Sequence, residues 1–269
     1  MKRMSRLIIL LLVSVMAAGL PAEAAEIFEP EVGQEGKDVI WVPTPQALVE
    51  KMLDVAKVTP RDFVIDLGSG DGRTVITAAK RGAKALGIEY NPDMVELSKR
   101  NAARAGVSDK ASFVNADLFE SDFSQAQVIT MFLLPDINIR LRPKILDLRP
   151  GTRIVSNSFT MGEWSADETV TVKGDCVSYC TAYLWIVPAK VDGRWRLGDG
   201  ELMLKQSFQK FTGSWRRGDK NTLIADARLN ADQISFSIGA TRYHGRVSGD
   251  SMEGTISGGG QWKATRLSK

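Results

Sequence analysis

Short apolar runs alternate with helix-like stretches from residue 62 to residue 159, and this alternation constrains the fold more than any other feature of the chain. Strands that are separated by helices pair in parallel, and the helices then cover both faces of the sheet. The pattern therefore predicts an α/β fold built on a parallel sheet. We expect strands at 62–68, 83–90, 111–117, 126–134 and 152–159, and helices at 72–82, 92–106 and 137–148.

A further helix is expected before the first of these strands, within WVPTPQALVEKMLDVAKV (41–58). Thr44 suits the N-cap of this helix and Pro45 its first position, and apolar residues follow at helical spacing. The preceding residues 26–40 are polar and contain glycine and proline, so they predict a loose leader.

The pattern changes after about residue 198. The runs at 180–189 and 193–198 are separated by KVDG and predict an antiparallel hairpin that completes the sheet. Residues 199–269 contain short alternating runs divided by the turns GDKN, NAD, SGD and SGGG, which predict a small antiparallel β module, a half-barrel or meander. The predicted organisation is a sheet domain at 41–198 followed by this module.

A glycine-rich turn, DLGSGDG (66–72), follows the first predicted strand. Gly68, Gly70 and Gly72 allow a tight turn and let a ligand approach the backbone. In open parallel sheets the carboxyl ends of the strands form the ligand site, so this turn is a candidate cofactor loop. Its D-x-G-x-G-x-G spacing differs from the G-x-G-x-x-G of dinucleotide folds, which remain the alternative.

Acidic residues mark three successive strand ends. Asp66 and Asp71 would repel a pyrophosphate but suit a cationic amino-acid group. Glu89 lies nineteen residues after Gly70, where a carboxylate can accept both ribose hydroxyls, and Asp117 can accept from an adenine amino group. Singly, each carboxylate could instead be solvated or cap a helix, and Asp71 could stabilise a helix N-terminus. Together they predict an extended adenosyl ligand without phosphate.

These motifs resemble the class I S-adenosylmethionine-dependent methyltransferases over roughly residues 40–190. WVPTPQALVEKML, DLGSGDGRTVITAAKRGAKALGIEYNP, ADLF and LLPDINIRLRPKI are similar to the branch that contains the mitochondrial lysine methyltransferases of the ATP synthase c subunit and the adenine nucleotide translocase. The resemblance implies a seven-stranded Rossmann-like sheet, S-adenosylmethionine as the methyl donor, and a protein lysine as the acceptor. The cofactor-binding residues that it implies are Asp66, Gly68, Ser69, Gly70, Asp71, Glu89, Tyr90, Asp117 and Leu118.

The acceptor side is less well defined by the sequence. Many amine methyltransferases carry Asn or Asp, then Pro-Pro and an aromatic residue after the fourth strand, whereas this chain has FLLPDIN (132–138). This departure leaves Pro135, Asp136 and Asn138 as candidate acceptor residues and assigns no catalytic base. The alternative interpretation is a catalytically inactive methyltransferase fold that serves as a binding module at the cell envelope.

The N-terminus predicts export. Lys2, Arg3 and Arg6 precede a 14-residue apolar run (7–20), and AEAA follows at 22–25, which is typical of a secretory signal peptide (1–25) cleaved after Ala24 or Ala25. The run is shorter than the roughly 20 residues that span a bilayer. We expect a periplasmic or extracellular protein, with an uncleaved membrane anchor as the alternative and a membrane-associated protein among the candidate acceptors.

Composition limits the partners. Lys and Arg number 35 against 32 Asp and Glu and are scattered, which disfavours nucleic acid as a partner. The two cysteines, Cys176 and Cys180, are too few for a structural metal site. In an extended strand they would lie about 13 Å apart, so a disulfide between them requires a turn, and the sequence leaves their redox state open.

Overall fold

A computed structural model describes residues 28–268, so the predicted signal peptide lies outside the described residues, as does the very start of the leader. Seven strands form one sheet in the order β3-β2-β1-β4-β5-β7-β6. β1 to β5 are parallel, whereas β7 runs antiparallel to both β5 and β6. The strands are β1 (Phe63–Leu67), β2 (Lys84–Glu89), β3 (Ala111–Asn115), β4 (Val128–Met131), β5 (Arg153–Asn157), β6 (Glu168–Thr171) and β7 (Thr181–Ile186). The predicted seven-stranded Rossmann-like sheet is confirmed, and β6 is the strand of it that the sequence pattern did not predict.

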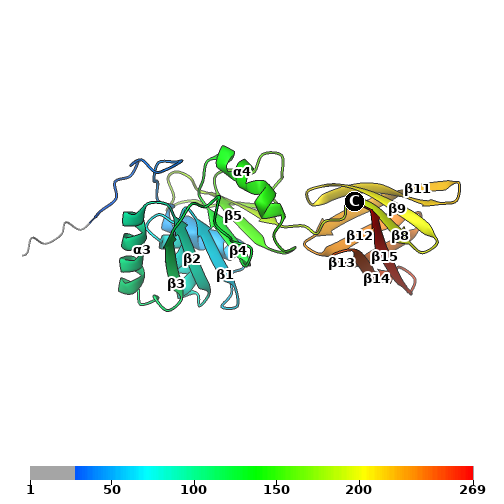
Figure 1. Cartoon of the computed structure of the whole chain (residues 1–269), viewed down its shortest axis with the longest axis horizontal. Coiled ribbons are helices and arrows are strands. Elements are labelled where there is room, and N and C mark those ends of the chain that lie inside the picture. Colours follow the sequence, from blue (N-terminus) through cyan, green and yellow to red (C-terminus); the bar gives the residue numbers. More distant parts are fainter. Residues whose placement is uncertain (1–27, 269) are drawn as a thin grey trace, which may run out of the picture.

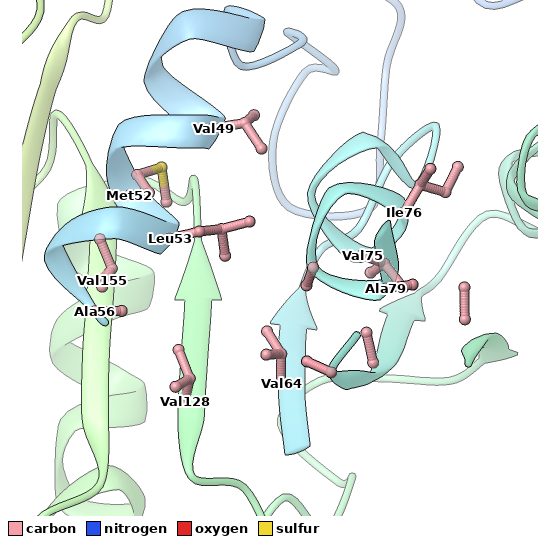
Figure 2. Packing of buried hydrophobic residues seen from close by; sticks show 14 of the residues in the cluster. Val49, Met52, Leu53, Ala56, Val64, Val75, Ile76, Ala79, Val128 and Val155 are labelled. Atoms are coloured by element: carbon pink, nitrogen blue, oxygen red, sulfur yellow. The ribbon is translucent and has the colours of Figure 1, made fainter. Parts of the chain in front are cut away.

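Helices cover both faces of this sheet, as the sequence predicts. α1 (Gln46–Val55), α2 (Arg73–Lys80) and α3 (Pro92–Arg104) share one hydrophobic cluster with one face, and α4 (Pro135–Leu146) packs on the other. Figure 2 shows the first cluster, where α1 and α2 direct apolar side chains toward Val64, Val128 and Val155 of the central strands. Side chains of a strand alternate between faces, so the next residue, Ile65, belongs to the second cluster.

The first helix begins one residue later than expected, and Thr44 does not cap it. Pro45 occupies the N-cap position without a side-chain hydrogen bond. The Thr44 hydroxyl instead accepts a hydrogen bond of 3.2 Å from Asn157 Nδ2, at the end of β5. The N-cap prediction is therefore wrong, because a buried tertiary contact takes the hydroxyl that the local pattern assigned to the helix.

The C-terminal β module is a closed antiparallel barrel (Figure 1). Its strands are β8 (Gly193–Leu197), β9 (Gly200–Ser207), β10 (Lys210–Arg217), β11 (Lys220–Asn230), β12 (Gln233–Ile238), β13 (Thr241–Ser248), β14 (Ser251–Ile256) and β15 (Gln261–Ser268). β8 pairs with β9 and β15, which closes the barrel. The expected hairpin of 180–189 with 193–198 is therefore wrong, and the boundary expected after residue 198 falls inside the barrel.

The barrel has its own aromatic core and lies at the opposite end of the sheet from β3 and α3 (Figure 1). Trp195 and Phe236 are fully buried in it, and Phe236 stacks on Tyr243 with ring centroids 4.9 Å apart. Among the described residues, no helix is long and apolar enough to cross a membrane.

Cys176 and Cys180 form a disulfide with their Cα atoms 5.8 Å apart. They lie in the connection between β6 and β7, where Thr171 pairs with Thr181 across the hairpin. This connection supplies the turn that the C-x3-C spacing required.

Candidate active site

One cavity lies at the carboxyl ends of the parallel strands, and it brings together every residue that the sequence assigned to the cofactor. All nine line it, as does Thr74 at the start of α2. They reach it because β1, β2 and β3 are neighbours in the sheet, so the loops after these strands meet at one edge. Their assignment to a cofactor stays a prediction, and the geometry below describes what they present to the cavity.

The glycine turn after β1 has the backbone shape that only glycine adopts freely. Gly68, Gly70 and Gly72 have φ of 75°, 54° and 82°. A Cβ on Gly70 would lie 2.7 Å from Nε1 of Trp41, which packs against the turn. The amide of Gly70 donates to Glu89 Oε2 at 2.9 Å, so the carboxylate at the end of β2 fixes this turn.

Glu89 keeps free capacity for a ligand. Its Oε1 accepts a hydrogen bond of 2.9 Å from the amide of Asn91, and each carboxylate oxygen can accept a second bond. A bidentate role toward two adjacent hydroxyl groups is compatible with this arrangement.

A buried polar atom in the same turn has no partner within the described chain. Ser69 is 5% exposed, and its Oγ forms no hydrogen bond although the residue lines the cavity. A buried hydroxyl without a partner is costly, by about 1–3 kcal/mol. This Oγ lies against β2, since a Cβ on Gly87 would be 2.4 Å from it. The carboxylates of Asp66, Glu89 and Asp117 around the cavity are the groups that fit a bound adenosyl cofactor.

Asp66 is the most strongly perturbed group in the cavity. Its side chain is buried at the end of β1, and Thr130 Oγ1 of β4 donates to Oδ1 at 2.6 Å. Burial raises the pKa of Asp66, the hydrogen bond from Thr130 opposes this, and the negative charges of Glu89 and Asp71 add to the rise, which brings the pKa to about 7. A cationic ligand group beside Asp66 would favour its charged form.

Asp71 is already paired. Arg73 Nε lies 3.0 and 3.1 Å from its two carboxylate oxygens, and Arg73 Nη2 lies 2.6 Å from Oδ2. The same guanidinium donates to the carbonyl of Thr44 at 2.9 Å, which ties the turn to the segment before α1. Asp71 therefore presents less free negative charge to a ligand than the sequence suggested.

Asp117 also has a partner, and the sequence did not reveal it. Lys37 forms an ion pair with Asp117 Oδ2 and lies over the Tyr90 ring, 4.7 Å from its centroid. The amide of Phe119 donates to Oδ1 at 2.8 Å. The hydrogen bond with Asp117 raises the pKa of Lys37, and the same bond lowers the pKa of Asp117.

The described part of the leader covers the cavity and is not loose. Gly33 N donates to Trp41 O at 2.9 Å, Trp41 N donates to Gln34 O at 2.9 Å, and residues 34–44 line the cavity. The expectation of a loose leader is wrong for these residues, because Trp41 and Lys37 bind to the glycine turn and to Asp117. The only sequence features that could have predicted this contact are the basic residue Lys37 and the aromatic residue Trp41 in and beside an otherwise polar segment.

The candidate acceptor residues do not line the cavity. Pro135 and Asp136 are exposed at the start of α4. Asn138 is fully buried, and its Nδ2 donates to the carbonyls of Phe159 and Thr160 at 3.4 and 3.2 Å. Asn138 thus holds the loop after β5 in place.

Aromatic residues form the side of the cavity that the acceptor prediction missed. Phe132 follows β4, Phe159 follows β5 and Tyr179 precedes β7, and all three line the cavity. Their ring centroids lie 5.1–6.0 Å apart in all three pairings. We name this group the aromatic wall. Aromatic residues after neighbouring strands were its only sequence signal.

Within residues 28–268, no group of three or more His, Cys, Asp and Glu side chains could hold a metal ion. The expected independence from metals stays a prediction.

Known proteins match the part of the chain that carries this site. The ANTKMT methyltransferase domain matches residues 66–168. A protein-lysine N-methyltransferase of Saccharolobus islandicus is 43% identical over 152 residues, which is 55% of this chain and 94% of that protein. The mouse lysine N-methyltransferase of the ATP synthase c subunit is 37% identical over 130 residues, 48% of this chain and 52% of the mouse protein.

A solved structure has the same fold. The RNA methyltransferase from Salinibacter ruber, in complex with S-adenosyl-L-homocysteine, is 46% identical with a TM-score of 0.53, over 56% of this chain and 96% of that one. Together with the nine residues gathered at one cavity, these matches establish the fold, the cofactor and the class of reaction. The chain belongs to the class I S-adenosylmethionine-dependent methyltransferases, in the family of the ANTKMT methyltransferase domain.

Proposed function

We propose that this methyltransferase transfers methyl groups to lysine side chains of a protein. The observation that carries the proposal is the two-sided cavity, which has carboxylates over β1 to β3 and the aromatic wall over β4, β5 and β7. The Saccharolobus islandicus relative, a protein-lysine N-methyltransferase, supports this acceptor.

We assign the cofactor to the carboxylate side. Asp66 and the turn of Gly68 to Asp71 would hold the amino-acid part, Glu89 the ribose hydroxyls, and Asp117 with Leu118 the adenine. When bound, S-adenosylmethionine supplies a methyl group that is already activated on a sulfonium.

The chain then has to present a neutral amine in line with that methyl group. The rings of Phe132 and Phe159 make one side of the cavity apolar, and removal from water lowers the pKa of a lysine amine. Residues 34–44, which include Trp41, cover the cavity and limit the access of water. We assign no residue as a general base.

The acceptor class can be tested with labelled cofactor. Purified protein is incubated with methyl-tritiated S-adenosylmethionine and a total cell extract, and the protein and RNA fractions are then separated. After acid hydrolysis of the protein, we expect the label in mono-, di- or trimethyllysine. Label confined to RNA would contradict the proposal, and so would an absence of transfer with intact cofactor binding, which would favour an inactive binding module.

We further propose that the protein is exported. The predicted signal peptide at 1–25 supports export, and so does the Cys176–Cys180 disulfide, since such bonds persist in oxidising compartments. N-terminal sequencing of the protein recovered from the periplasm or medium should give a start at Ala25 or Glu26. Recovery of the uncleaved chain in the membrane fraction would indicate an anchor instead.

A further inference from the structure

The connection between β6 and β7 contributes a tyrosine to the cavity from outside the matched domain. The match to the ANTKMT methyltransferase domain ends at residue 168, where β6 begins. Tyr179 lies eleven residues later, one residue before the disulfide cysteine Cys180. The aromatic wall is thus completed by a residue that lies beyond the matched stretch.

Tyr179 is held in an unusual backbone conformation beside the cavity. Its φ is 55°, and that of Ser158, just before Phe159, is 57°. Bulky side chains rarely adopt the left-handed region, and such residues persist where the surrounding structure enforces them. Here the disulfide closes the loop, and the amide of Val172 donates to the Cys180 carbonyl at 2.9 Å. The ring of Tyr179 then meets that of Phe132 edge-on, with centroids 5.1 Å apart.

The wall keeps aromatic surface accessible. Tyr179 is 43% exposed, and Phe132 and Phe159 are half-buried although they contact one another. Aromatic faces attract ammonium groups, and their carbon surface packs against a four-carbon stem. The wall lies over β4, β5 and β7, across the cavity from the carboxylates over β2 and β3.

We propose that Tyr179, positioned by the Cys176–Cys180 disulfide against Phe132 and Phe159, forms the binding subsite for the acceptor lysine and for its methylated product. This rests on the proposed function, because it names the part of the same cavity that receives the lysine. The carboxylates hold the donor, and the aromatic wall holds the stem of the acceptor lysine and the cationic head of its methylated product.

The test measures binding of a small probe to the full chain saturated with S-adenosylhomocysteine. The probe is Nα-acetyl-trimethyllysine methylamide, compared by NMR titration with its uncharged isostere, in which a tert-butyl group replaces the trimethylammonium. We expect the wild-type protein to prefer the cationic probe, and Tyr179→Ala to weaken its binding by at least about fivefold. Tyr179→Phe should restore binding, since the ring is kept.

The control residue is Val177, which is fully exposed in the same loop and does not line the cavity. Val177→Ala should bind the probe as the wild type does. The double variant Cys176→Ser, Cys180→Ser should weaken probe binding while leaving the affinity for S-adenosylhomocysteine within about twofold, which also shows that the variant is folded. If the double variant binds the probe like the wild type, the disulfide does not position Tyr179.

Two results would overturn the subsite: no preference of the wild type for the cationic probe, or equal probe binding by wild type and Tyr179→Ala. Failure of the proposed function gives a different result. In that case probe binding depends on Tyr179, but the labelling experiment yields no methyllysine. Methyllysine formation that is unaffected by Tyr179→Ala would instead support the function and reject the subsite.

Discussion

Asp66 links the stability of the protein to pH. Its pKa rises from an ordinary value of 3.8 to about 7 on folding, mainly because the side chain is buried. Between these two values the folded chain binds the proton and the unfolded chain does not. The protonated carboxyl therefore contributes stability that is fully present below pH 3.8 and is lost as the pH rises through about 7.

Without cofactor, we expect the free energy of unfolding to fall as the pH rises from about 4 to about 8, by an amount on the order of 4 kcal/mol that is due to Asp66. Asp66→Asn should remove this part of the pH dependence, because the amide does not titrate. Urea unfolding of both proteins at several pH values measures it, with Asp219→Asn in an exposed barrel turn as the control. If the free energy of unfolding changed with pH by the same amount in the wild type and in Asp66→Asn, the prediction would be contradicted.

Glu89 supports both the glycine turn and the predicted ribose contact. Glu89→Gln keeps one acceptor oxygen but turns an NH2 group toward either the Gly70 or the Asn91 amide, where two donors then face each other. We expect the affinity for S-adenosylhomocysteine to fall at least about tenfold, or about 1.4 kcal/mol, in calorimetric titration. Glu96→Gln, on the exposed side of α3, should bind as the wild type does. Unchanged affinity in Glu89→Gln would remove Glu89 from the cofactor site.

At the scale of elements, the segment before α1 acts as a cover over the strand ends. Lys37 reaches Asp117 across 80 positions of sequence, and Trp41 packs on Gly70. Asp117 therefore has two competing partners, the Lys37 ammonium and the predicted adenine amino group. The cover and the cofactor meet at this carboxylate.

Replacing Lys37 should show which partner Asp117 serves. In Lys37→Met the carboxylate is released, and we expect the affinity for S-adenosylhomocysteine to rise a few-fold and to depend less on salt, because the ion pair no longer has to be broken. Lys99→Met, which removes a similar pair with Glu96 on exposed α3, is the matched control. Weaker binding by Lys37→Met alone would mean that Lys37 helps to hold the cofactor.

At the scale of the whole molecule, the sequence predicts what is local and misses what is distant. Strand and helix periodicity places Asp66, Glu89 and Asp117 at neighbouring strand ends, because parallel strands separated by helices leave few other arrangements. Thr44 was misassigned because its partner, Asn157, is 113 positions away. β8 was placed in the wrong sheet although its hairpin with β9 is local, because the same strand could follow either hairpin and its second pairing, with β15, joins the two ends of the module.

The barrel contributes none of the described residues that line the methyltransferase cavity. Among the described residues, those that line the cavity all precede Thr181, and the barrel begins at Gly193. Phe236 is fully buried in the barrel against Tyr243 and Trp262, so Phe236→Ala removes a large side chain from a packed core. Such a change costs about 3–5 kcal/mol, because a cavity remains.

We therefore expect Phe236→Ala to accelerate amide hydrogen exchange in β11 to β14 while leaving exchange in β1 and β2 unchanged. The affinity for S-adenosylhomocysteine should stay within about twofold of the wild type, since no contact in the cavity changes. Leu223→Ala, at a barrel residue that is 76% exposed, should alter neither measurement. If Phe236→Ala weakens cofactor binding, the barrel core supports the strand ends through the sheet, and barrel and site form one cooperative unit.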